Sequence, residues 1–193
     1  MIALEDLGHR QSFDLDFHTR AALVDTRPLL AELERSTEGG FEVVQVPDEL
    51  GSGFGGLLAL PGGEKIAIQV LSNYEDVPEG DLVPSTTAPP IQRVTLRRYL
   101  ADKIQCVVER VEARDLFDIG AVLGARPDLS LAARRFVADQ DALLLAERLT
   151  GWSEASIAED LGAYAGVDPR QAVVTLKMLL SWLAEDARGG GST

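Results

Sequence analysis

The sequence predicts an α+β protein, in which a small mixed sheet with flanking helices is followed by a C-terminal helical bundle. Three observations predict this fold. Short segments of alternating polar and apolar residues, typical of strands, fall in the first half of the chain. A proline-rich connection spans residues 83–90. Beyond it, apolar residues recur with helical spacing. We therefore expect one domain over residues 1–90, a second over residues 91–188, and a disordered tail over residues 189–193.

The first half contains signals for strands, turns and one clear helix. Polar and apolar residues alternate from Ser12 to Phe17, which predicts a strand. Thr26 is placed as a helix N-cap, and Pro28 suits the first turn that follows it. Pro61-Gly62-Gly63 separates two apolar runs and predicts a hairpin. The predicted elements are one or two helical turns within residues 2–9, a strand over 12–17, a helix over 29–35, a strand over 41–46, and hairpin strands over 56–60 and 65–71.

Everything after the proline-rich connection is predicted to be helical. Thr95 can cap the first of five helices, whose apolar residues share one face. Ser156 and Glu159 have the spacing of a capping box. The predicted helices cover residues 96–111, 116–123, 130–150 and 156–164, and a last one opens at residues 168–171 and continues to Leu183.

A glycine-rich segment, residues 51–56, matches the G-x-G-x-x-G pattern of dinucleotide-binding turns. That pattern requires a strand before it and a helix after it. Here Pro47-Asp48-Glu49 precedes it and the predicted hairpin follows it. We therefore predict a loop between strands and no dinucleotide site.

The charge of the chain restricts its partners. The 193 residues include 18 Lys and Arg and 31 Asp and Glu, a net charge of −13. So acidic a chain is not a general binder of polyanions, and any nucleic acid must be held by a local basic patch. Residues 1–90 hold 5 basic and 16 acidic side chains, whereas the stretch Arg93–Arg135 holds 9 basic and 6 acidic ones. That stretch has two open interpretations, an RNA-contacting surface or solvated helix faces.

The sequence also indicates a compartment. Its one cysteine, Cys106, excludes an internal disulfide and suits a reducing environment. No apolar run reaches the ~18–20 residues that a membrane span requires. Residues 1–20 contain no apolar core of a signal peptide. We expect a soluble, cytoplasmic protein with no membrane partner.

Two carboxylates, Asp14 and Asp16, are the most informative pair. In a strand, residues i and i+2 point to the same face, so both side chains project side by side. Like charges so close repel unless a cation lies between them. Mg²⁺ suits two carboxylates together with phosphate oxygens. The alternative is an acidic pair on an exposed strand face.

Several cationic and hydroxyl groups could bind phosphate. Gly8, Arg10 and Ser12 supply a flexible glycine, a cation and a hydroxyl just before the predicted strand. His9 lies among them, with a phosphate contact and a plain polar role both open. Further along, Lys103, Arg110 and Arg114 have the spacing of one face of a continuous helix, and the alternative is three solvated cations.

Three linked motifs resemble a known family. They are the segment from Ile2 to Phe17, Leu100-Ala101-Asp102-Lys103-Ile104, and Arg114-Asp115-Leu116-Phe117-Asp118. In order, spacing and the intervening hairpin they resemble the AbiEii/AbiGii nucleotidyltransferase toxin family over roughly residues 2–125. The resemblance implies a polymerase-β-like nucleotidyltransferase fold with a helical C-terminal part. It also implies Mg²⁺, a nucleoside triphosphate (NTP) as substrate, addition of nucleotides to the 3′ acceptor end of tRNA that blocks translation, and a cognate antitoxin protein.

The resemblance also implies roles for individual residues. Four of them match catalytic positions of the family, two match nucleotide-binding positions, and two are supporting neighbours. The catalytic positions are Asp14, Asp16, Lys103 and Asp115; Asp14 and Asp16 are also metal ligands, and Lys103 also binds nucleotide. Ser12 and Arg10 contact the triphosphate. Arg114 and Asp118 support the site.

The chemistry of these groups suits nucleotidyl transfer. Lys103 can supply positive charge where negative charge develops. Asp115 can hold Lys103 or Arg114 in place, or accept a proton from the attacking hydroxyl. The residues leave these roles of Asp115 open.

Two departures from the family pattern support an alternative function. The family carries a Gly-Gly-Thr/Ser turn before the Ala3-Leu4 position, but here the sequence begins at Met1-Ile2, so either the start lies upstream or this is a shortened variant. Gln69 stands where many nucleotidyltransferases place a third carboxylate. The alternative is a catalytically degenerate module of the same fold that binds nucleotide or an antitoxin partner. A third hypothesis is nucleotide transfer onto a protein or small molecule.

Overall fold

The computed structural model describes residues 3–10, 12, 14–19, 23, 25–46, 53–72, 77–89, 91–110 and 112–189. The chain divides into two compact units. The sheet unit comprises residues 12–78, and the helical unit comprises residues 1–11 together with 79–193. The units therefore divide after residues 11 and 78, whereas the proline-rich connection led us to expect one boundary at residue 90.

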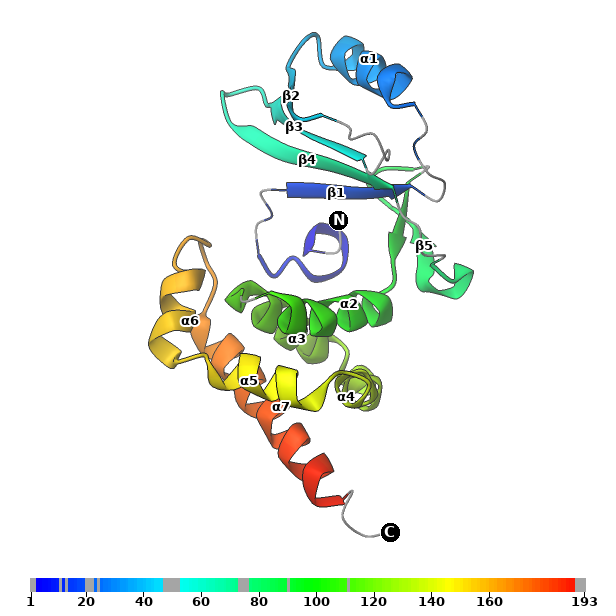
Figure 1. Ribbon diagram of the computed structural model, residues 1–193. Helices are drawn as coiled ribbons and strands as arrows, with labels where there is room; N and C mark the ends of the chain where they lie inside the picture. The colour runs from blue at the N-terminus through cyan, green and yellow to red at the C-terminus, as the bar shows by residue number, and fades with distance from the viewer. Residues whose placement is uncertain are drawn as a thin grey trace. The chain divides into compact units, whose positions relative to one another are not determined.

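The sheet unit contains a four-stranded mixed sheet and one helix, as the predicted α+β class requires (Figure 1). The strand order is β1-β4-β3-β2. β1 and β4 are parallel, and the other two neighbouring pairs are antiparallel. The strands are β1 (Asp14–Thr19), β2 (Phe41–Gln45), β3 (Gly53–Ala59) and β4 (Lys65–Ser72), and the helix is α1 (Arg27–Ser36).

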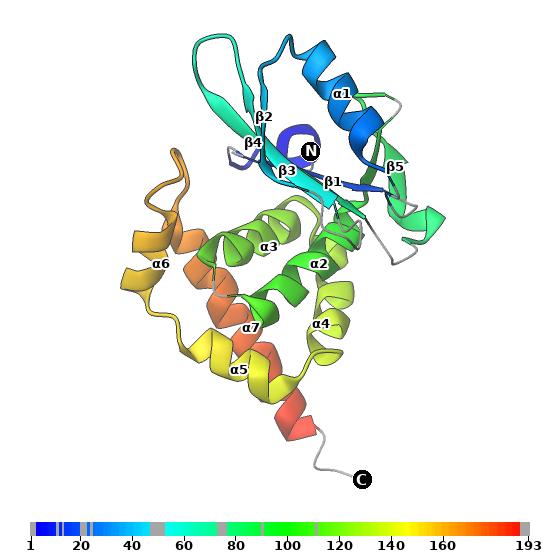
Figure 2. The same ribbon diagram turned by 45° about the horizontal axis from the view of Figure 1, so that its top comes forward.

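Helix α1 covers one face of this sheet (Figures 1 and 2). Its Leu30 and Leu33 pack against a buried cluster of strand residues, Phe41, Phe54, Ile68 and Val70. Phe17 of β1 packs against the same cluster. Because successive strand residues point to opposite faces, Asp14 and Asp16 lie on the face away from α1. The sheet thus separates an apolar core from a carboxylate face.

The start of α1 and the glycine-rich segment refine two predictions. Thr26 precedes α1 as expected, but its side chain makes no capping bond; instead Asp25 accepts the N–H of Arg27 at 3.0 Å. The prediction of a loop up to Gly56 is wrong from Gly53 onward, because β3 begins there. Residues 51 and 52 lie outside the described residues. The long run of strand pairing with β4 extends β3 through these glycines.

The helical unit is built around one large apolar core. Helix α7 packs against α3, α4, α5 and α6 (Figure 2). The core includes Leu100, Ile104, Leu116, Leu145 and Leu179, each at most 1% exposed. The elements are η1 (Ala3–Leu7), η2 (Glu79–Asp81), β5 (Leu82–Pro84), β6 (Gln92–Val94), α2 (Leu96–Glu109), α3 (Ala113–Ala125), η3 (Pro127–Leu129), α4 (Ser130–Ala138), α5 (Ala142–Thr150), α6 (Glu154–Leu161) and α7 (Pro169–Gly189).

Three helix predictions need correction. A single helix over residues 130–150 is wrong: α4 ends at Ala138, and Asp141 caps a new helix by accepting the N–H groups of Leu143 and Leu144, both at 3.0 Å. The capping box at Ser156 and Glu159 is also wrong, because Ser153 is the N-cap of α6 and exchanges hydrogen bonds with Ser156. Helices α5 and α6 each begin where a short polar side chain satisfies free backbone N–H groups.

The third correction concerns the cation spacing. Thr95 caps α2 as predicted and accepts the N–H of Arg98 at 3.2 Å. The helix ends at Glu109, however, and Arg110 has extended backbone angles. Lys103, Arg110 and Arg114 therefore do not share one face of a continuous helix. Val111, predicted as the last residue of that helix, lies outside the described residues.

The N-terminal residues belong to the helical unit. Residues 3–7 form a π-helical turn, in agreement with the predicted helical turns, and Leu7 packs against the large core. The side chain of Glu5 is 1% exposed. It accepts hydrogen bonds from the hydroxyls of Ser85 (2.6 Å) and Thr87 (2.5 Å) and from the N–H of Thr86 (3.0 Å), and it pairs with Arg93 (3.0 Å). The proline-rich connection therefore includes a binding loop for this carboxylate, between the paired strands β5 and β6.

The last helix includes the first residue of the predicted disordered tail. α7 continues to Gly189, the last described residue, so that position is helical. The other residues of the predicted tail, 190–193, lie outside the described residues. Within the described part of the chain, none of the helices combines the length and the apolar character that crossing a bilayer requires.

Candidate active site

The sheet unit carries the predicted acidic pair on one strand face. Asp14 is half-buried and Asp16 is exposed. The hydroxyl of Ser12 donates to Asp14 Oδ1 at 2.8 Å. In the parallel ladder Asp16 stands opposite Gln69 of β4, so an amide lies beside the carboxylate pair. Two carboxylates and an amide carbonyl are hard oxygen donors, which fits a divalent cation that keeps water or phosphate oxygens as its other ligands. Among the described residues, no group of three or more His, Cys, Asp or Glu side chains forms a complete metal cage.

The helical unit contains a buried polar network centred on Asp118 of α3. The Asp118 carboxylate is fully buried and has four partners. Oδ1 accepts from His9 Nε2 at 2.7 Å and from Arg10 Nε at 2.6 Å. Oδ2 accepts from Arg10 Nη2 and the Tyr99 hydroxyl, both at 2.8 Å, and lies 2.9 Å from Lys103 Nζ. Burial opposes ionisation of this carboxyl group, but the donors and cations outweigh it and hold the pKa of Asp118 well below its usual range.

Lys103 lies between two carboxylates. Its Nζ is 2.7 Å from Asp115 Oδ1 as well as 2.9 Å from Asp118 Oδ2. Burial lowers the pKa of Lys103, yet the charges of Asp118 and Asp115 raise it above its ordinary value overall. The ammonium therefore stays charged at neutral pH although its side chain is only 11% exposed.

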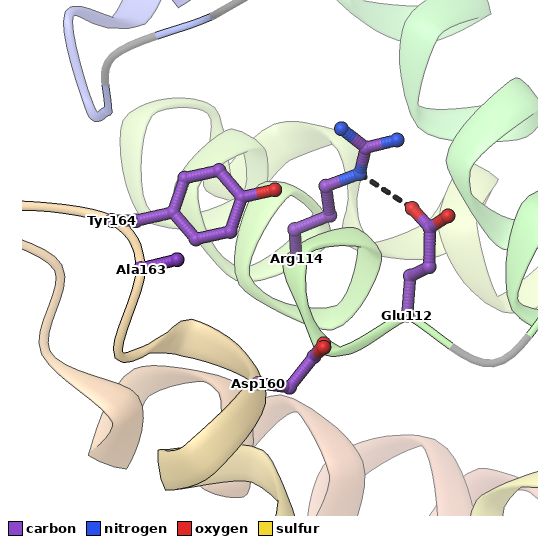
Figure 3. Close-up of a pocket in the computed structure, with 5 residues that line it drawn as sticks. All are labelled: Glu112, Arg114, Asp160, Ala163 and Tyr164. Carbon is purple, nitrogen blue, oxygen red and sulfur yellow. Dashed lines mark hydrogen bonds and ion pairs between the residues drawn. The ribbon is translucent and has the colours of Figure 1, made fainter.

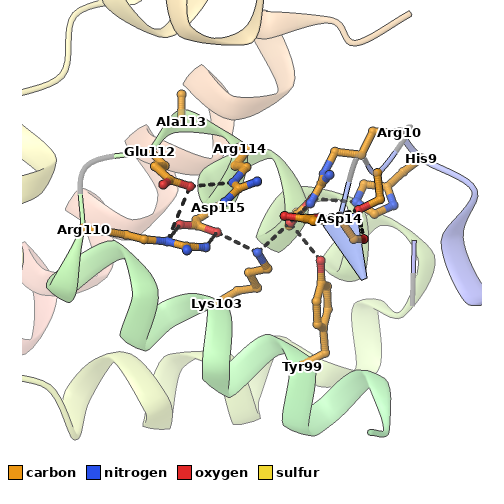
Figure 4. A network of polar contacts seen from close by, with 12 residues as sticks. His9, Arg10, Asp14, Tyr99, Lys103, Arg110, Glu112, Ala113, Arg114 and Asp115 are labelled. Atoms are coloured by element: carbon orange, nitrogen blue, oxygen red, sulfur yellow. Dashed lines mark hydrogen bonds and ion pairs between the residues drawn. The ribbon is translucent and has the colours of Figure 1, made fainter. Parts of the chain in front are cut away.

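Asp115 makes one of the contacts that the sequence left open. Besides Lys103 it accepts from Arg110, with Nε 2.9 Å from Oδ2 and Nη2 3.0 Å from Oδ1 (Figure 4). Arg114 turns to Glu112 instead, with its Nε 2.5 Å from the carboxylate. The structure thus places Asp115 as the partner of Lys103. Arg110 joins the network through Asp115, not through a shared helix face.

His9 packs inside the network. Its ring stacks on Phe117 with centroids 5.7 Å apart, and its Nε2 meets Asp118. Among the described residues, His9 Nδ1 is the buried side-chain polar atom with no hydrogen-bond partner. The contact with Asp118 fits the plain polar role that the sequence allowed for this histidine.

A pocket of about 360 Å³ lies next to this network in the helical unit (Figure 3). Arg114 and Tyr164 face each other across it, and Asp160 accepts the N–H of Ala113 at 2.6 Å. Of the residues that line the pocket, Arg114 is the one predicted from the sequence as a site residue. No motif marks the others. The pocket is lined by Glu112, Arg114, Asp160, Ala163 and Tyr164.

The structure groups the predicted site residues in two sets, one in each unit. Ser12, Asp14 and Asp16 lie together in the sheet unit. Four others meet in one network of the helical unit, with Arg114 at its border. That set is Arg10, Lys103, Asp115 and Asp118. Tyr99 completes it and was missed, because a lone tyrosine on a helix carries no signal of its hydrogen-bond partner.

Comparison with protein families identifies the chain. The family model described as "Nucleotidyl transferase AbiEii toxin, Type IV TA system" matches residues 3–171. The chain belongs to the AbiEii nucleotidyltransferase toxin family. The AbiEii match extends beyond residue 125, where the resemblance recognised in the sequence ended, and includes most of the helices.

A solved structure has a similar fold. A crystal structure of a candidate nucleotidyltransferase from H. pylori is similar to this chain with a TM-score of 0.51 and 18% identity, and covers 95% of this chain and 84% of that one. At this identity the similarity shows the nucleotidyltransferase fold. None of the curated protein sequences compared with the chain matches it.

Membership of the AbiEii family establishes the general activity. The protein is a nucleotidyltransferase of a type IV toxin–antitoxin system, and its family implies an antitoxin partner. Nucleotidyltransferases of this kind generally use an NTP and a divalent metal. The carboxylates of Asp14 and Asp16 in the sheet unit have the chemistry of ligands for such a metal.

Proposed function

We propose that this protein is a toxin that transfers nucleotides from an NTP to the 3′ acceptor end of tRNA, with Mg²⁺ as the metal, and so blocks translation in the cytoplasm. The observation that supports the proposal best is the Lys103 ammonium, buried and held by Asp115 and Asp118 in a chain of the AbiEii family. A fixed, desolvated cation of this kind has its greatest effect where a phosphate group gains negative charge.

The sheet unit supplies the metal ligands in this proposal. Asp14 and Asp16 would hold Mg²⁺, which would offset the negative charge of the triphosphate and so favour attack by a hydroxyl. Ser12 of the sheet unit and Arg10 of the helical unit would contact the triphosphate, because a hydroxyl and a guanidinium are strong donors to phosphate oxygens. The hydrogen bond from Ser12 to Asp14 also fixes the orientation of that carboxylate.

The helical unit supplies the positive charge. As the 3′ hydroxyl of the acceptor loses its proton to water and its oxygen bonds to the α-phosphorus, the bond to pyrophosphate breaks and pyrophosphate leaves; Lys103 stabilises the charge that accumulates on the phosphate oxygens. Asp115 orients Lys103 by its 2.7 Å contact. Asp118 and Arg114 support the site, Asp118 by fixing Lys103 and Arg10.

A labelling assay tests the proposal. Each of the four labelled NTPs is incubated with total tRNA and Mg²⁺ and the wild type, Asp16→Ala, Lys103→Ala or Lys177→Ala. Lys177 is an exposed lysine paired with Glu154, so it controls for the loss of a lysine elsewhere in the helical unit. We expect label on tRNA with the wild type and Lys177→Ala, and a rate lower by at least about 100-fold in the other two variants. No transfer of any nucleotide by the wild type, or full activity of Lys103→Ala, would refute the proposal.

One observation favours a second candidate, a catalytically degenerate binding module. Gln69 stands opposite Asp16 in the β1–β4 ladder, so an uncharged amide occupies the neighbouring strand position. Calorimetry separates the two candidates. NTP binding that depends on Mg²⁺ without any transfer to tRNA, protein or small-molecule acceptors would favour the binding module.

A further inference from the structure

The pocket beside the Lys103 network has no role in the contacts described so far. It lies between the start of α3, which carries Arg114, and the segment after α6, which carries Ala163 and Tyr164 (Figure 3). Its volume of about 360 Å³ is within the range of small-ligand sites. Arg114 is 22% exposed and Tyr164 is half-buried, so both reach solvent from a fixed position.

Two chains of contacts join this pocket to Lys103. On one side Glu112 lies 3.5 Å from Arg110, and Arg110 holds Asp115. On the other side the Arg10 guanidinium lies 5.7 Å from the centre of the Tyr164 ring, and Arg10 binds Asp118. The walls of the pocket are therefore connected to both carboxylates that hold Lys103.

The lining groups suit a flat ligand that has both donors and acceptors. An aromatic ring and a guanidinium plane are the surfaces on which nucleobases stack. The carboxylates of Glu112 and Asp160 accept hydrogen bonds from N–H groups of a base edge, and Arg114 donates to its carbonyl or ring nitrogen atoms. A bare phosphate fits poorly, because two carboxylates line the pocket.

We propose that this pocket binds a nucleobase, with Tyr164 as the stacking surface and Arg114 and the two carboxylates reading the base edge. The inference rests on the proposed function, because a nucleotidyltransferase offers two sources of such a base. One is the NTP, and the other is the 3′-terminal nucleoside of the acceptor RNA. Both present the same chemistry to the pocket.

Binding measurements on the full chain test the inference without requiring turnover. Calorimetry gives the affinity for each NTP and for inorganic tripolyphosphate, which has no base, and fluorescence anisotropy gives the affinity for labelled tRNA. The variants are Tyr164→Ala, Tyr164→Phe and Ala163→Leu, which fills the pocket. Ala138→Leu, at an exposed position at the end of α4, is the matched control.

The source of the base determines which affinity changes. If the base belongs to the NTP, Tyr164→Ala and Ala163→Leu weaken NTP binding by at least about fivefold and leave tripolyphosphate binding unchanged. If it belongs to the acceptor, the same variants weaken tRNA binding by a similar factor. Ala138→Leu binds as the wild type does in both cases, and Tyr164→Phe, which keeps the ring, binds more tightly than Tyr164→Ala.

The inference is overturned if both pocket variants bind every NTP and tRNA as tightly as the wild type. Should Tyr164→Ala lose its fold, as circular dichroism would show, Ala163→Leu decides the question alone. Failure of the proposed function is a separate result. If the protein transfers no nucleotide but binds NTPs more tightly than tripolyphosphate, and this difference depends on Tyr164, then the pocket binds a base although the proposed reaction is wrong.

Discussion

Among single residues, Asp118 carries the negative charge on which the buried network of the helical unit depends. A fully buried carboxylate is costly unless its oxygens are paired and hydrogen-bonded. Here four side chains surround it, two of them permanently or predominantly cationic, Arg10 and Lys103. Removing the Asp118 anion leaves less negative charge to balance the positive charges of Arg10 and Lys103. The network is therefore more sensitive to loss of Asp118 than to loss of any one partner.

Replacing Asp118 by Asn keeps the shape and removes the charge. We expect Asp118→Asn to lower the free energy of unfolding by about 3–5 kcal/mol, because Arg10 and Lys103 lose their shared anion. Urea denaturation monitored by circular dichroism measures the change. Asp128→Asn is the control: Asp128 pairs with Arg126 in solvent and is 61% exposed, so little change is expected there. Equal stability of Asp118→Asn and the wild type would contradict this account of the network.

The same substitution has a defined pH dependence. The pKa of Asp118 is lowered in the folded protein, so its stabilisation is complete above the ordinary carboxyl pKa of 3.8 and is lost as the pH falls below it. The pKa of Lys103 is raised, so its contribution is complete below 10.5 and is lost only as the pH rises beyond that value. The stability difference between wild type and Asp118→Asn should therefore be present at neutral pH and shrink below about pH 4.

Among structural elements, the N-terminal turn η1 is attached to the helical unit by an acidic side chain. The hydroxyls of Ser85 and Thr87 and the N–H of Thr86 donate to Glu5, and these bonds hold the pKa of Glu5 well below its usual range. The segment that follows η1 carries His9 and Arg10 to Asp118. One carboxylate thus helps to position two partners of the buried network.

Glu5→Gln tests this attachment. The amide keeps the length of the side chain but loses the charge that pairs with Arg93. We expect faster amide hydrogen exchange over residues 3–10 at neutral pH, with the exchange of α7 unchanged, because the turn opens locally. Since the pKa of Glu5 is lowered on folding, the difference from the wild type should disappear as the pH falls below 4.5. Glu159→Gln, at an exposed position on α6, is the control, and equal exchange in both variants would refute the attachment.

Strand β3 depends on a glycine that the sequence pattern does not explain. A Cβ at Gly56 would overlap the Phe41 ring and the carbonyl oxygen of Glu42, whereas a Cβ at Gly55 would make ordinary contacts of 3.6 Å with Gln45. We expect Gly56→Ala to destabilise the sheet unit by roughly 1–3 kcal/mol and Gly55→Ala to have a smaller effect. Thermal unfolding of both variants checks this. The reverse order would show that Phe41 does not fill the space beside Gly56.

Local signals made some elements predictable and others not. Thr95 and the helical spacing after it predicted α2, and Pro61-Gly62-Gly63 predicted the β3–β4 hairpin, because these signals act within a few residues. The break between α4 and α5 was missed, although Asp141 has the chemistry of an N-cap, since leucines continue the apolar pattern on both sides. The parallel pairing of β1 with β4 joins segments about 50 residues apart and has no local signal.

The candidate site shows the same contrast between local and distant information. The side-by-side placement of Asp14 and Asp16 followed from strand geometry alone. The resemblance supplied Lys103 and Asp115, which the structure then joined. The contacts of His9 and Arg10 with Asp118 cross more than 100 residues of sequence, so only the folded chain could show them.

For the whole molecule, the distribution of charge bears on RNA binding. Eight of the nine basic side chains from Arg93 to Arg135, all among the described residues, form ion pairs with carboxylates; the ninth is Arg135. A phosphate backbone must therefore compete with internal carboxylates for these cations. This makes a broad electrostatic surface less favourable than recognition of the acceptor end at a defined site.

The central proposal is that Asp16 and Lys103 both contribute to nucleotidyl transfer. The most direct test is the rate of label transfer from NTP to tRNA for the wild type, Asp16→Ala, Lys103→Ala and the double variant. When two residues act as one catalytic group, replacing the second costs little further rate once the first has been replaced. We therefore predict that the double variant is no slower than the slower single variant. Losses that multiply in the double variant, or a wild-type rate in Lys103→Ala, would contradict the claim.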